Sequence, residues 1–372
     1  MKRIAAFFCA ILLLTTPVRA LEVDAPAALL MEKETGTVLF AKGEHQQLEP
    51  ASVTKVMTLL LVMEAIDSGQ LHWDDTVTAS AHACSMGGSQ IWLKENEQMS
   101  VSDMVKAVCV VSANDCAVAL AEAVAGSEEA FVEKMNRRAA ELGMADTVFC
   151  NATGLPAAGH VTSAADIALM SRELILHHPD IRQYTTIWMD TLRDGQSSLV
   201  NTNKLIRFYD GATGLKTGST DAAGYCLSAT AERDGMELIA VILKDATSAQ
   251  RFEDAKTLLN HGFANYALVN VTAGQALPPV EVSLGAQATV QPVLESRSVL
   301  LEKAAAAGVE REVDLASSVE APVAKGDQLG KLTVTSGGEV VAEVPILAGE
   351  DVPRITYGAM ALRLLRSAFL AA

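Results

Sequence analysis

Ser52 and Lys55 lie three residues apart in the stretch EPASVTKVMT, just ahead of an apolar run. Residues at i and i+3 share one face of a helix, so the lysine amine can reach the serine hydroxyl. Serine is a poor nucleophile until a base takes its proton, and lysine becomes such a base when burial and a second cation lower its pKa. A capped helix with a surface lysine has the same pattern, and about one such pair is expected by chance in a chain this long.

Two further motifs separate these alternatives. The tripeptide Ser-Ala-Asn at 112–114 is expected within a helix, and Lys-Thr-Gly at 216–218 is expected on a strand. Each of Ser-x-x-Lys, Ser-x-Asn and Lys-Thr-Gly occurs once in the chain, and their order is that of the penicillin-recognising serine acyl enzymes. No Gly-x-Ser-x-Gly elbow is present, so an α/β-hydrolase triad has no nucleophile here.

Longer stretches around these motifs closely resemble the low-molecular-mass penicillin-binding proteins that are D-alanyl-D-alanine carboxypeptidases. The stretches are PASVTKVMT, SMGGSQIWL, VSANDCAVALAE, NATGL, GLKTGSTDAAGYCLSATA and APVAKGDQLGKLTV, and the resemblance runs from about Pro26 to the C-terminal tail. In that family the centre of Ser-x-Asn is small, as Ala113 is here. The class A β-lactamases carry Ser-Asp-Asn and a deacylating Glu-x-x-Leu-Asn loop, which this sequence lacks.

The resemblance implies a role for each motif residue. Ser52 is the implied nucleophile, Lys55 its general base and Ser112 a proton relay. As a second cation, Lys216 would keep Lys55 neutral and attract the substrate carboxylate, while Gly218 would leave room for the substrate. The implied substrate-binding residues are Asn114, Lys216, Thr217, Gly218, Ser219 and Arg251.

At two of these positions, Arg251 and Ser219, the role implied by the resemblance is not the only interpretation. Arg251 matches a family arginine that helps bind the terminal carboxylate, but an ordinary helix-start arginine paired with Glu253 or Asp254 fits equally well. Some members carry histidine where this chain has Ser219, which leaves the deacylation rate and the preferred pH open. The resemblance also implies that the backbone N–H groups of Ser52 and Ser219 hold the oxyanion.

The implied function is removal of the terminal D-alanine from peptidoglycan stem pentapeptides, in cell-wall biosynthesis, through an acyl-enzyme on Ser52. β-Lactam antibiotics would be covalent inhibitors. A D,D-endopeptidase or a weak β-lactamase could use the same site, and a non-catalytic binder of penicillin or muropeptides is the alternative from another class. No cofactor is expected, and the scattered histidines and the lack of Cys-x-x-Cys give no basis for a metal site.

Strands at both ends of residues 21–268, with helices between them, predict one antiparallel sheet covered by helices. Together with the resemblance, this implies an α/β (α+β) domain like those of serine transpeptidases and β-lactamases. The expected elements are a hairpin over 27–41, helices over 56–66, 102–124, 128–142 and 162–178, strands over 214–245, and a helix over 250–266. From 269 to 353, Pro and Gly interrupt short alternating stretches, which predicts a small β-sandwich-like domain with a turn at Gly337-Gly338.

Residues 1–20 have a basic start, the apolar run IAAFFCAILLL and a small-residue end at Ala20, which is typical of a signal peptide. The formal charge of −16 would become −19 on cleavage, because three basic and no acidic residues are removed. A protein this acidic is not expected to bind nucleic acid. We therefore expect an exported protein at the outer face of the cytoplasmic membrane. Its five remaining cysteines are expected to be mostly buried thiols, with a single disulfide bridge as the alternative.

Residues 354–372 are expected to form a short amphipathic helix. Apolar residues from Met360 to Phe369 cover one broad face, while Arg363, Arg366 and Ser367 lie on the other. The helix is too short to cross about 30 Å of hydrocarbon, so we expect it to lie on the membrane surface. The alternative is that it packs onto the β domain.

Overall fold

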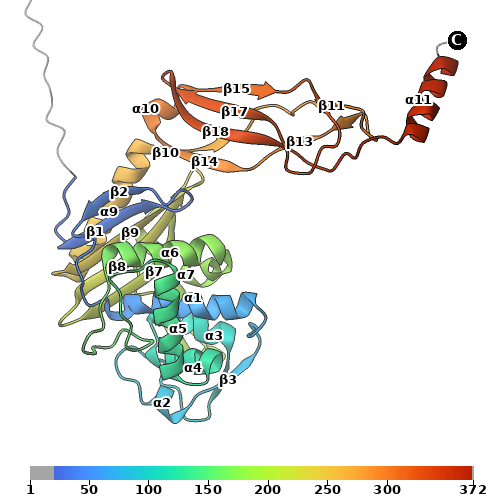
Figure 1. Ribbon diagram of the computed structural model, residues 1–372. Coiled ribbons are helices and arrows are strands. Elements are labelled where there is room, and N and C mark those ends of the chain that lie inside the picture. The colour runs from blue at the N-terminus through green and yellow to red at the C-terminus, as the bar shows by residue number, and fades with distance from the viewer. Residues whose placement is uncertain (1–20, 371–372) are drawn as a thin grey trace, which may run out of the picture.

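The computed structural model describes residues 21–370, so the predicted signal peptide lies outside the described residues. The chain forms a domain of one sheet and several helices, followed by an elongated all-β domain and a terminal helix, α11 (Tyr357–Leu370) (Figure 1). The predicted fold class is confirmed.

The central sheet has five antiparallel strands in the order β2-β1-β9-β8-β7. They are β1 (Ala27–Glu32), β2 (Val38–Lys42), β7 (Ala212–Thr220), β8 (Gly224–Arg233) and β9 (Met236–Asp245). The first hairpin of the domain therefore pairs with strands from its last third. β7, which carries the Lys-Thr-Gly motif, is an edge strand.

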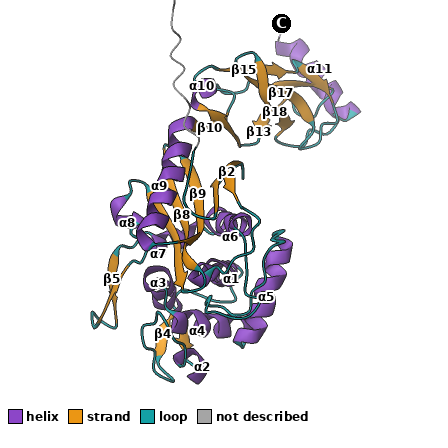
Figure 2. Cartoon of the chain, turned by 90° about the vertical axis from the view of Figure 1, so that its left-hand side faces the viewer, coloured by secondary structure: helices purple, strands orange, loops and turns teal. Residues whose placement is uncertain are grey.

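The alternating side chains of the sheet fill two separate cores. Leu29 and its odd-numbered neighbours in β1 pack under the helices that include α1 (Lys55–Asp67) and α6 (Ala164–His177). Leu30 and its even-numbered neighbours pack against α9 (Ser248–Asn265) on the opposite face (Figure 2). Successive residues of a strand point to opposite faces, so a sheet covered on both sides must be apolar throughout.

The predicted single helix over 102–124 is wrong, because the structure has two helices there. α3 (Val101–Val111) ends at Ser112, which adopts the left-handed conformation with φ of 65°, and α4 (Asn114–Ala125) begins two residues later. The backbone is satisfied at the break, since Asn114 N donates to Ser89 O at 2.7 Å. Apolar periodicity continues across the break and does not report the φ angle of one residue.

The remaining predicted helices and turns are confirmed within a few residues. Ser163 caps α6 through a bond from Asp166 N to Ser163 Oγ (3.2 Å), and Asp234-Gly235 turns β8 into β9 with positive φ at both residues. The other elements of this domain are a 3₁₀ turn η1 (Ala51–Thr54), α2 (Ala81–Cys84), α5 (Glu128–Glu141), η2 (Pro179–Ile181), α7 (Arg182–Thr185), α8 (Leu205–Phe208), and two small hairpins, β3 (Thr76–Thr78) with β4 (Gln98–Ser100) and β5 (Met189–Leu192) with β6 (Ser197–Val200).

The second domain consists of short strands around two small apolar cores. Its sheets are β13-β18-β17-β15, β12-β11-β16 and β10-β14. Their bounds are β10 (Tyr266–Val271), β11 (Val280–Ser283), β12 (Thr289–Val290), β13 (Pro292–Leu294), β14 (Arg297–Glu302), β15 (Val309–Leu315), β16 (Ser318–Glu320), β17 (Gln328–Ser336) and β18 (Glu339–Ala348), with α10 (Lys303–Ala306) after β14. The turn predicted at Gly337-Gly338 joins β17 to β18. β10 runs across the expected boundary between residues 268 and 269.

α11 lies at the far end of the β domain from the central sheet (Figure 1). Arg363 donates to the carbonyl oxygens of Gly285 (3.3 Å) and Ala286 (3.1 Å), so the helix touches a loop of the β domain through this side chain. Among the described residues, no helix is both long enough and apolar enough to cross a membrane.

Candidate active site

Ser52 and Lys55 meet where η1 passes into α1. Lys55 Nζ lies 2.9 Å from Ser52 Oγ and donates to Thr153 O at 2.6 Å. The lysine side chain is 0 % exposed, although it is the first residue of α1. The pair is therefore a buried amine in contact with a hydroxyl, which excludes the alternative of a surface lysine on a capped helix.

The electrostatics favour a neutral amine at Lys55. Burial, followed by the nearby charge of Lys216, holds the pKa of Lys55 well below its usual value. Lys216 is also 0 % exposed, and burial lowers its pKa to about 7. Its Nζ donates to Thr217 O at 2.9 Å. Two buried amines beside each other oppose double protonation, so Lys55 is suited to accept a proton from Ser52.

The break between α3 and α4 carries Ser112 and Asn114, both of which are buried. Ser112 Oγ and Asn114 Oδ1 are buried and have no hydrogen-bond partner among the described residues, whereas Asn114 Nδ2 donates to Gly87 O at 2.7 Å. A buried polar atom without a partner costs about 1–3 kcal/mol, so such atoms in a native site are suited to bind a ligand.

β7 places the third motif along its free edge. Thr217 Oγ1 lies 2.7 Å from Thr202 Oγ1, and Ser219 is exposed. An added Cβ on Gly218 would lie 2.8 Å from both Pro50 O and Ser52 N. The space left by this glycine is therefore filled by the backbone that carries Ser52, and not by open room for a substrate as the sequence led us to expect.

Arg251 is buried behind this strand. Its Nη1 donates to Gly218 O (2.9 Å) and to Cys226 O (3.2 Å), and the side chain is 6 % exposed. The alternative pairing with Glu253 or Asp254 is absent among the described residues, where Glu253 binds Lys256 instead. The structure brings seven of the nine predicted site residues together at the Ser52 turn and β7, with Arg251 directly behind the strand, while Ser112 and Asn114 lie at the break between α3 and α4.

The loop that contains Asn151, Thr153 and Gly154 also belongs to the site, because Thr153 O accepts a hydrogen bond from Lys55 Nζ. The sequence motifs did not predict this contact. Asn151 Oδ1 accepts from Thr153 N (3.1 Å) and Gly154 N (2.7 Å), which turns Thr153 O toward Lys55. Gly154 has φ of +80°, and a Cβ there would lie 1.8 Å from Ala51 O. The NATGL stretch was noticed in the sequence, but a carbonyl contact leaves no side-chain signature.

His160 holds the same loop against η1. Cys150 N donates to His160 Nδ1 (3.0 Å), so His160 Nε2 carries the proton and donates to Thr54 Oγ1 (2.8 Å). Burial lowers the pKa of His160 to about 4, which keeps the ring neutral at ordinary pH. This histidine therefore supports the Ser52 turn from outside the site.

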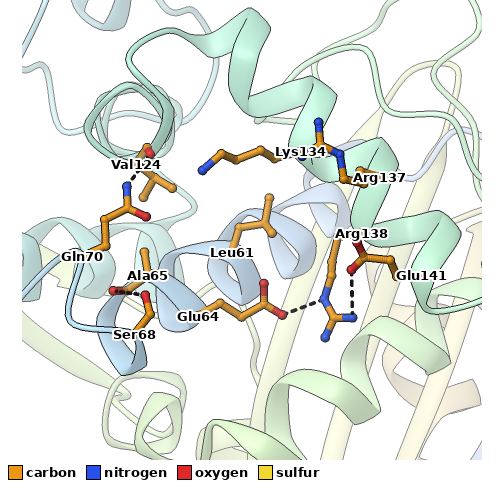
Figure 3. A pocket seen from close by; sticks show the side chains of 10 residues that line it. All are labelled: Leu61, Glu64, Ala65, Ser68, Gln70, Val124, Lys134, Arg137, Arg138 and Glu141. Carbon is orange, nitrogen blue, oxygen red and sulfur yellow. Dashed lines mark hydrogen bonds and ion pairs between the residues drawn. The ribbon is translucent and has the colours of Figure 1, made fainter.

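Other features of the described residues do not add chemistry to this site. A hollow of about 360 Å³ between α1 and α5 is lined by Arg138, which pairs with Glu64 and Glu141, but by none of the predicted site residues (Figure 3). No cluster of metal-ligating side chains occurs within residues 21–370. The five cysteines there are free thiols, of which Cys109, Cys116 and Cys226 are buried and Cys150 is exposed.

Comparison with known proteins finds the same two-part organisation. A family model described as D-alanyl-D-alanine carboxypeptidase matches residues 14–247, and one described as penicillin-binding protein 5, C-terminal domain, matches residues 270–354. D-alanyl-D-alanine carboxypeptidase DacF of Bacillus subtilis is 42% identical over 340 residues, which cover 90% of this chain and 87% of that protein.

Solved structures of penicillin-binding proteins are also similar to this chain. Penicillin binding protein 5 from Haemophilus influenzae is 30% identical with a TM-score of 0.75, and the match covers 90% of this chain and 98% of the other. Penicillin-binding protein D2 from Listeria monocytogenes, in its ampicillin-bound form, is 34% identical with a TM-score of 0.60 and covers 65% of this chain and 99% of its own.

Proposed function

The chain belongs to the D-alanyl-D-alanine carboxypeptidase family, and from this premise we propose that Ser52 is the residue it acylates. The protein is a serine-type D-Ala-D-Ala carboxypeptidase, a hydrolase that removes the terminal D-alanine of peptidoglycan stem peptides. The observation that carries the assignment of Ser52 is its 2.9 Å contact with the buried amine of Lys55.

In the proposed acylation step, Ser52 Oγ attacks the carbonyl carbon of the penultimate D-alanine while Lys55 Nζ takes the hydroxyl proton. The backbone N–H groups of Ser52 and Ser219 hold the resulting oxyanion. The C–N bond to the terminal D-alanine then breaks, and Ser112 Oγ passes the proton to the departing amine. Water hydrolyses the ester, which releases the shortened peptide and restores Ser52.

Substrate binding is assigned to the polar groups around this centre. Asn114 Oδ1, which lacks a partner among the described residues, accepts from the peptide backbone, and Thr217 lines the β7 edge against which the extended peptide lies. Lys216 supplies positive charge for the terminal carboxylate, and Ser219 adds an exposed hydroxyl beside it. Direct contact of Arg251 with that carboxylate stays a prediction.

Labelling with a fluorescent penicillin tests the assignment of Ser52. Mature wild-type protein should be labelled on the peptide that contains Ser52 and should release D-alanine from diacetyl-L-Lys-D-Ala-D-Ala. Ser52→Ala should do neither. Ser68→Ala, which removes a hydroxyl at the other end of α1, is the matched control and should behave as wild type. Covalent labelling of Ser52→Ala would refute the assignment.

The persistence of the label separates a carboxypeptidase from a β-lactamase that uses the same site. The sequence lacks the Glu-x-x-Leu-Asn loop, so the penicilloyl enzyme should last for minutes or longer while D-alanine release from peptide continues in unlabelled enzyme. Recovery of free enzyme within seconds of a penicillin pulse would instead favour the β-lactamase alternative.

Location and domain limits belong to the same proposal. A signal peptide at 1–20 exports the protein, and the carboxypeptidase domain at 21–268 is followed by the β domain at 269–353. The segment 354–372 attaches the enzyme to the outer surface of the cytoplasmic membrane. Its support is the helical conformation of α11 and the placement of this helix at the outer end of the molecule (Figure 1).

A further inference from the structure

The peptide group between Gly218 and Ser219 is held at its carbonyl oxygen by the Arg251 side chain. Its carbonyl oxygen, Gly218 O, accepts from Arg251 Nη1 at 2.9 Å, and the same nitrogen donates to Cys226 O at 3.2 Å. Gly218 and Cys226 are directly opposite each other in the β7–β8 ladder. One guanidinium nitrogen therefore ties the two strands together beside the turn that carries Ser52.

The direction of this bond matters because the 218–219 peptide is trans. A trans peptide points its C=O and its N–H in opposite directions, so a donor on Gly218 O lies on the far side from Ser219 N–H. Ser219 N–H is one of the two proposed oxyanion donors. The other belongs to Ser52, whose nitrogen would be 2.8 Å from a Cβ on Gly218. Both donors therefore adjoin the residue that Arg251 holds.

The guanidinium is buried and only partly compensated. It lies over the rings of Phe252 (4.8 Å) and Tyr225 (5.4 Å), and its Nε has no hydrogen-bond partner among the described residues. The buried carboxylate of Asp245 forms no ion pair with it within 4.0 Å in the described part of the chain. A charged donor makes roughly twice as strong a hydrogen bond as a neutral one, and bonds in series polarise one another.

We propose that Arg251 is a positioning residue of the oxyanion site. It fixes and polarises the Gly218–Ser219 peptide, so that Ser219 N–H is aimed at the developing oxyanion and donates more strongly. This inference rests on the proposed acylation of Ser52. It differs from direct binding of the substrate carboxylate, because a residue that acts through the peptide is needed for every acyl donor, with or without a carboxylate.

Two thioester donors with the same acyl group distinguish these roles. One has a leaving group that ends in a carboxylate, and the other has its methyl ester. Arg251→Gln should lower the acylation rate constant at saturating donor by 10-fold or more, equally for both donors and with little change in KM. A loss confined to the carboxylate donor, or expressed in KM alone, would overturn the proposal in favour of carboxylate binding.

The acyl-enzyme provides a direct spectroscopic readout. The carbonyl of the penicilloyl ester on Ser52 lies between the proposed donors, so its infrared stretching frequency reports their strength. Arg251→Gln should raise this frequency, because the weakened Ser219 N–H polarises the carbonyl less. Arg251→Lys, which retains the buried charge, should give a smaller shift and a smaller rate loss. Identical frequencies in wild type and both variants would overturn the proposal.

Arg233 offers a matched control on the same sheet. Its guanidinium also donates to a backbone carbonyl, Asp210 O (2.9 and 3.2 Å), and lies over two rings, Tyr209 and Phe263, but it is remote from the motifs. Arg233→Gln should leave both donor rates and the ester frequency unchanged. If wild type is not acylated at Ser52, the proposed function fails; if it is acylated and Arg251→Gln matches Arg233→Gln, only this inference fails.

Discussion

At the scale of single residues, the two buried lysines make different contacts although they lie near each other. Lys55 contacts Ser52 Oγ directly, whereas Lys216 donates to its own strand at Thr217 O. Burial is the main cause that lowers the pKa of both lysines. The nearby charge of Lys216 lowers the pKa of Lys55 further, and the charge of Arg251 lowers that of Lys216. If Lys55 is the base, as proposed, the positive charge of Lys216 adds to burial in lowering the pH at which Lys55 can accept a proton.

The first prediction concerns that pH. Acylation needs neutral Lys55, so its rate rises as the pH passes upward through the pKa of Lys55. Lys216→Ala removes a positive charge that lowers this pKa, so the pKa rises and the acid limb of the profile should move up by about one pH unit or more. The measurement is the second-order rate of penicillin acylation from pH 5 to 10.

Lys216→Arg is the control for this shift, because it keeps the positive charge. Its acid limb should stay near that of wild type, although the larger side chain lowers the plateau. If Lys216→Ala and Lys216→Arg have the same limb as wild type, Lys216 does not set the pKa of Lys55.

A second prediction follows from the contact between β7 and η1. Gly218→Ala places a methyl group 2.8 Å from Pro50 O and Ser52 N, which are backbone atoms and cannot rotate away. We expect an overpacking cost of about 1–3 kcal/mol in unfolding free energy and a loss of acylation of about 100-fold, because Ser52 N is displaced. Chemical denaturation and penicillin labelling measure the two effects.

Gly308→Ala provides the reference for Gly218→Ala, since its added methyl meets only Ala305 O at 3.8 Å and its φ is not positive. It should change neither stability nor labelling by a measurable amount. A Gly218→Ala variant that acylates at the wild-type rate would show that the η1 backbone tolerates a shift at this position.

At the scale of elements, the loop from Cys150 to His160 supports the start of α1. Its carbonyl at Thr153 receives the Lys55 amine, and His160 Nε2 donates to Thr54 Oγ1 on η1. Gly154 passes so close to Ala51 that only a glycine fits. The loop thereby determines where the Lys55 amine points, which neither η1 nor α1 can do alone.

The third prediction tests this support. Asn151→Ala removes the acceptor for Thr153 N and Gly154 N, so the Thr153 carbonyl loses its fixed direction. We expect acylation to fall about 10-fold and the unfolding free energy to fall by about 1–3 kcal/mol, as for other buried groups left unpaired. Stopped-flow penicillin acylation and urea unfolding give both quantities.

Asn136→Ala is the matched comparison. Asn136 binds Phe149 N (2.9 Å) and Phe149 O (2.8 Å) nearby but has no contact with the Ser52 turn. It should lose similar stability and keep the wild-type acylation rate. Equal kinetic losses in the two variants would mean that general loosening, and not the direction of Thr153 O, affects the site.

At the scale of the whole molecule, α11 lies at the end of the β domain that is remote from the domain containing α1 and β7 (Figure 1). The β domain stands between them, so anything bound to α11 is separated from Ser52 by the length of that domain. A helix lying on a membrane would thus hold the site away from the lipid and toward the cell wall. Arg363 already binds carbonyls of the β domain, which would fix the orientation of the helix on it.

The fourth prediction is that residues 358–372 are needed for membrane attachment and not for chemistry. Mature full-length protein should sediment with anionic vesicles at low salt, and deletion of 358–372 should leave it in the supernatant. Release of D-alanine from a small peptide should be equal for the two forms. Failure of the full-length protein to sediment would contradict the attachment.

The sequence alone was enough to predict the contact between Ser52 and Lys55 and most of the elements. Ser52 and Lys55 are three residues apart, so a local helical geometry suffices to bring them into contact. The strands of the central sheet, the cap at Ser163 and the turn at Gly337-Gly338 also depend on short-range patterns, and these were predicted closely. Their signals lie within a few neighbouring residues.

The tertiary structure alone decided how these parts meet. Thr153 O reaches Lys55 from 98 residues away, and the break at Ser112 is supported by Ser89, which belongs to another loop. The bond from Arg251 to Gly218 O likewise joins α9 to β7. Such contacts involve backbone groups that every residue has, so the residue type at these positions does not predict them. They arise only when packing of the two cores brings distant segments together.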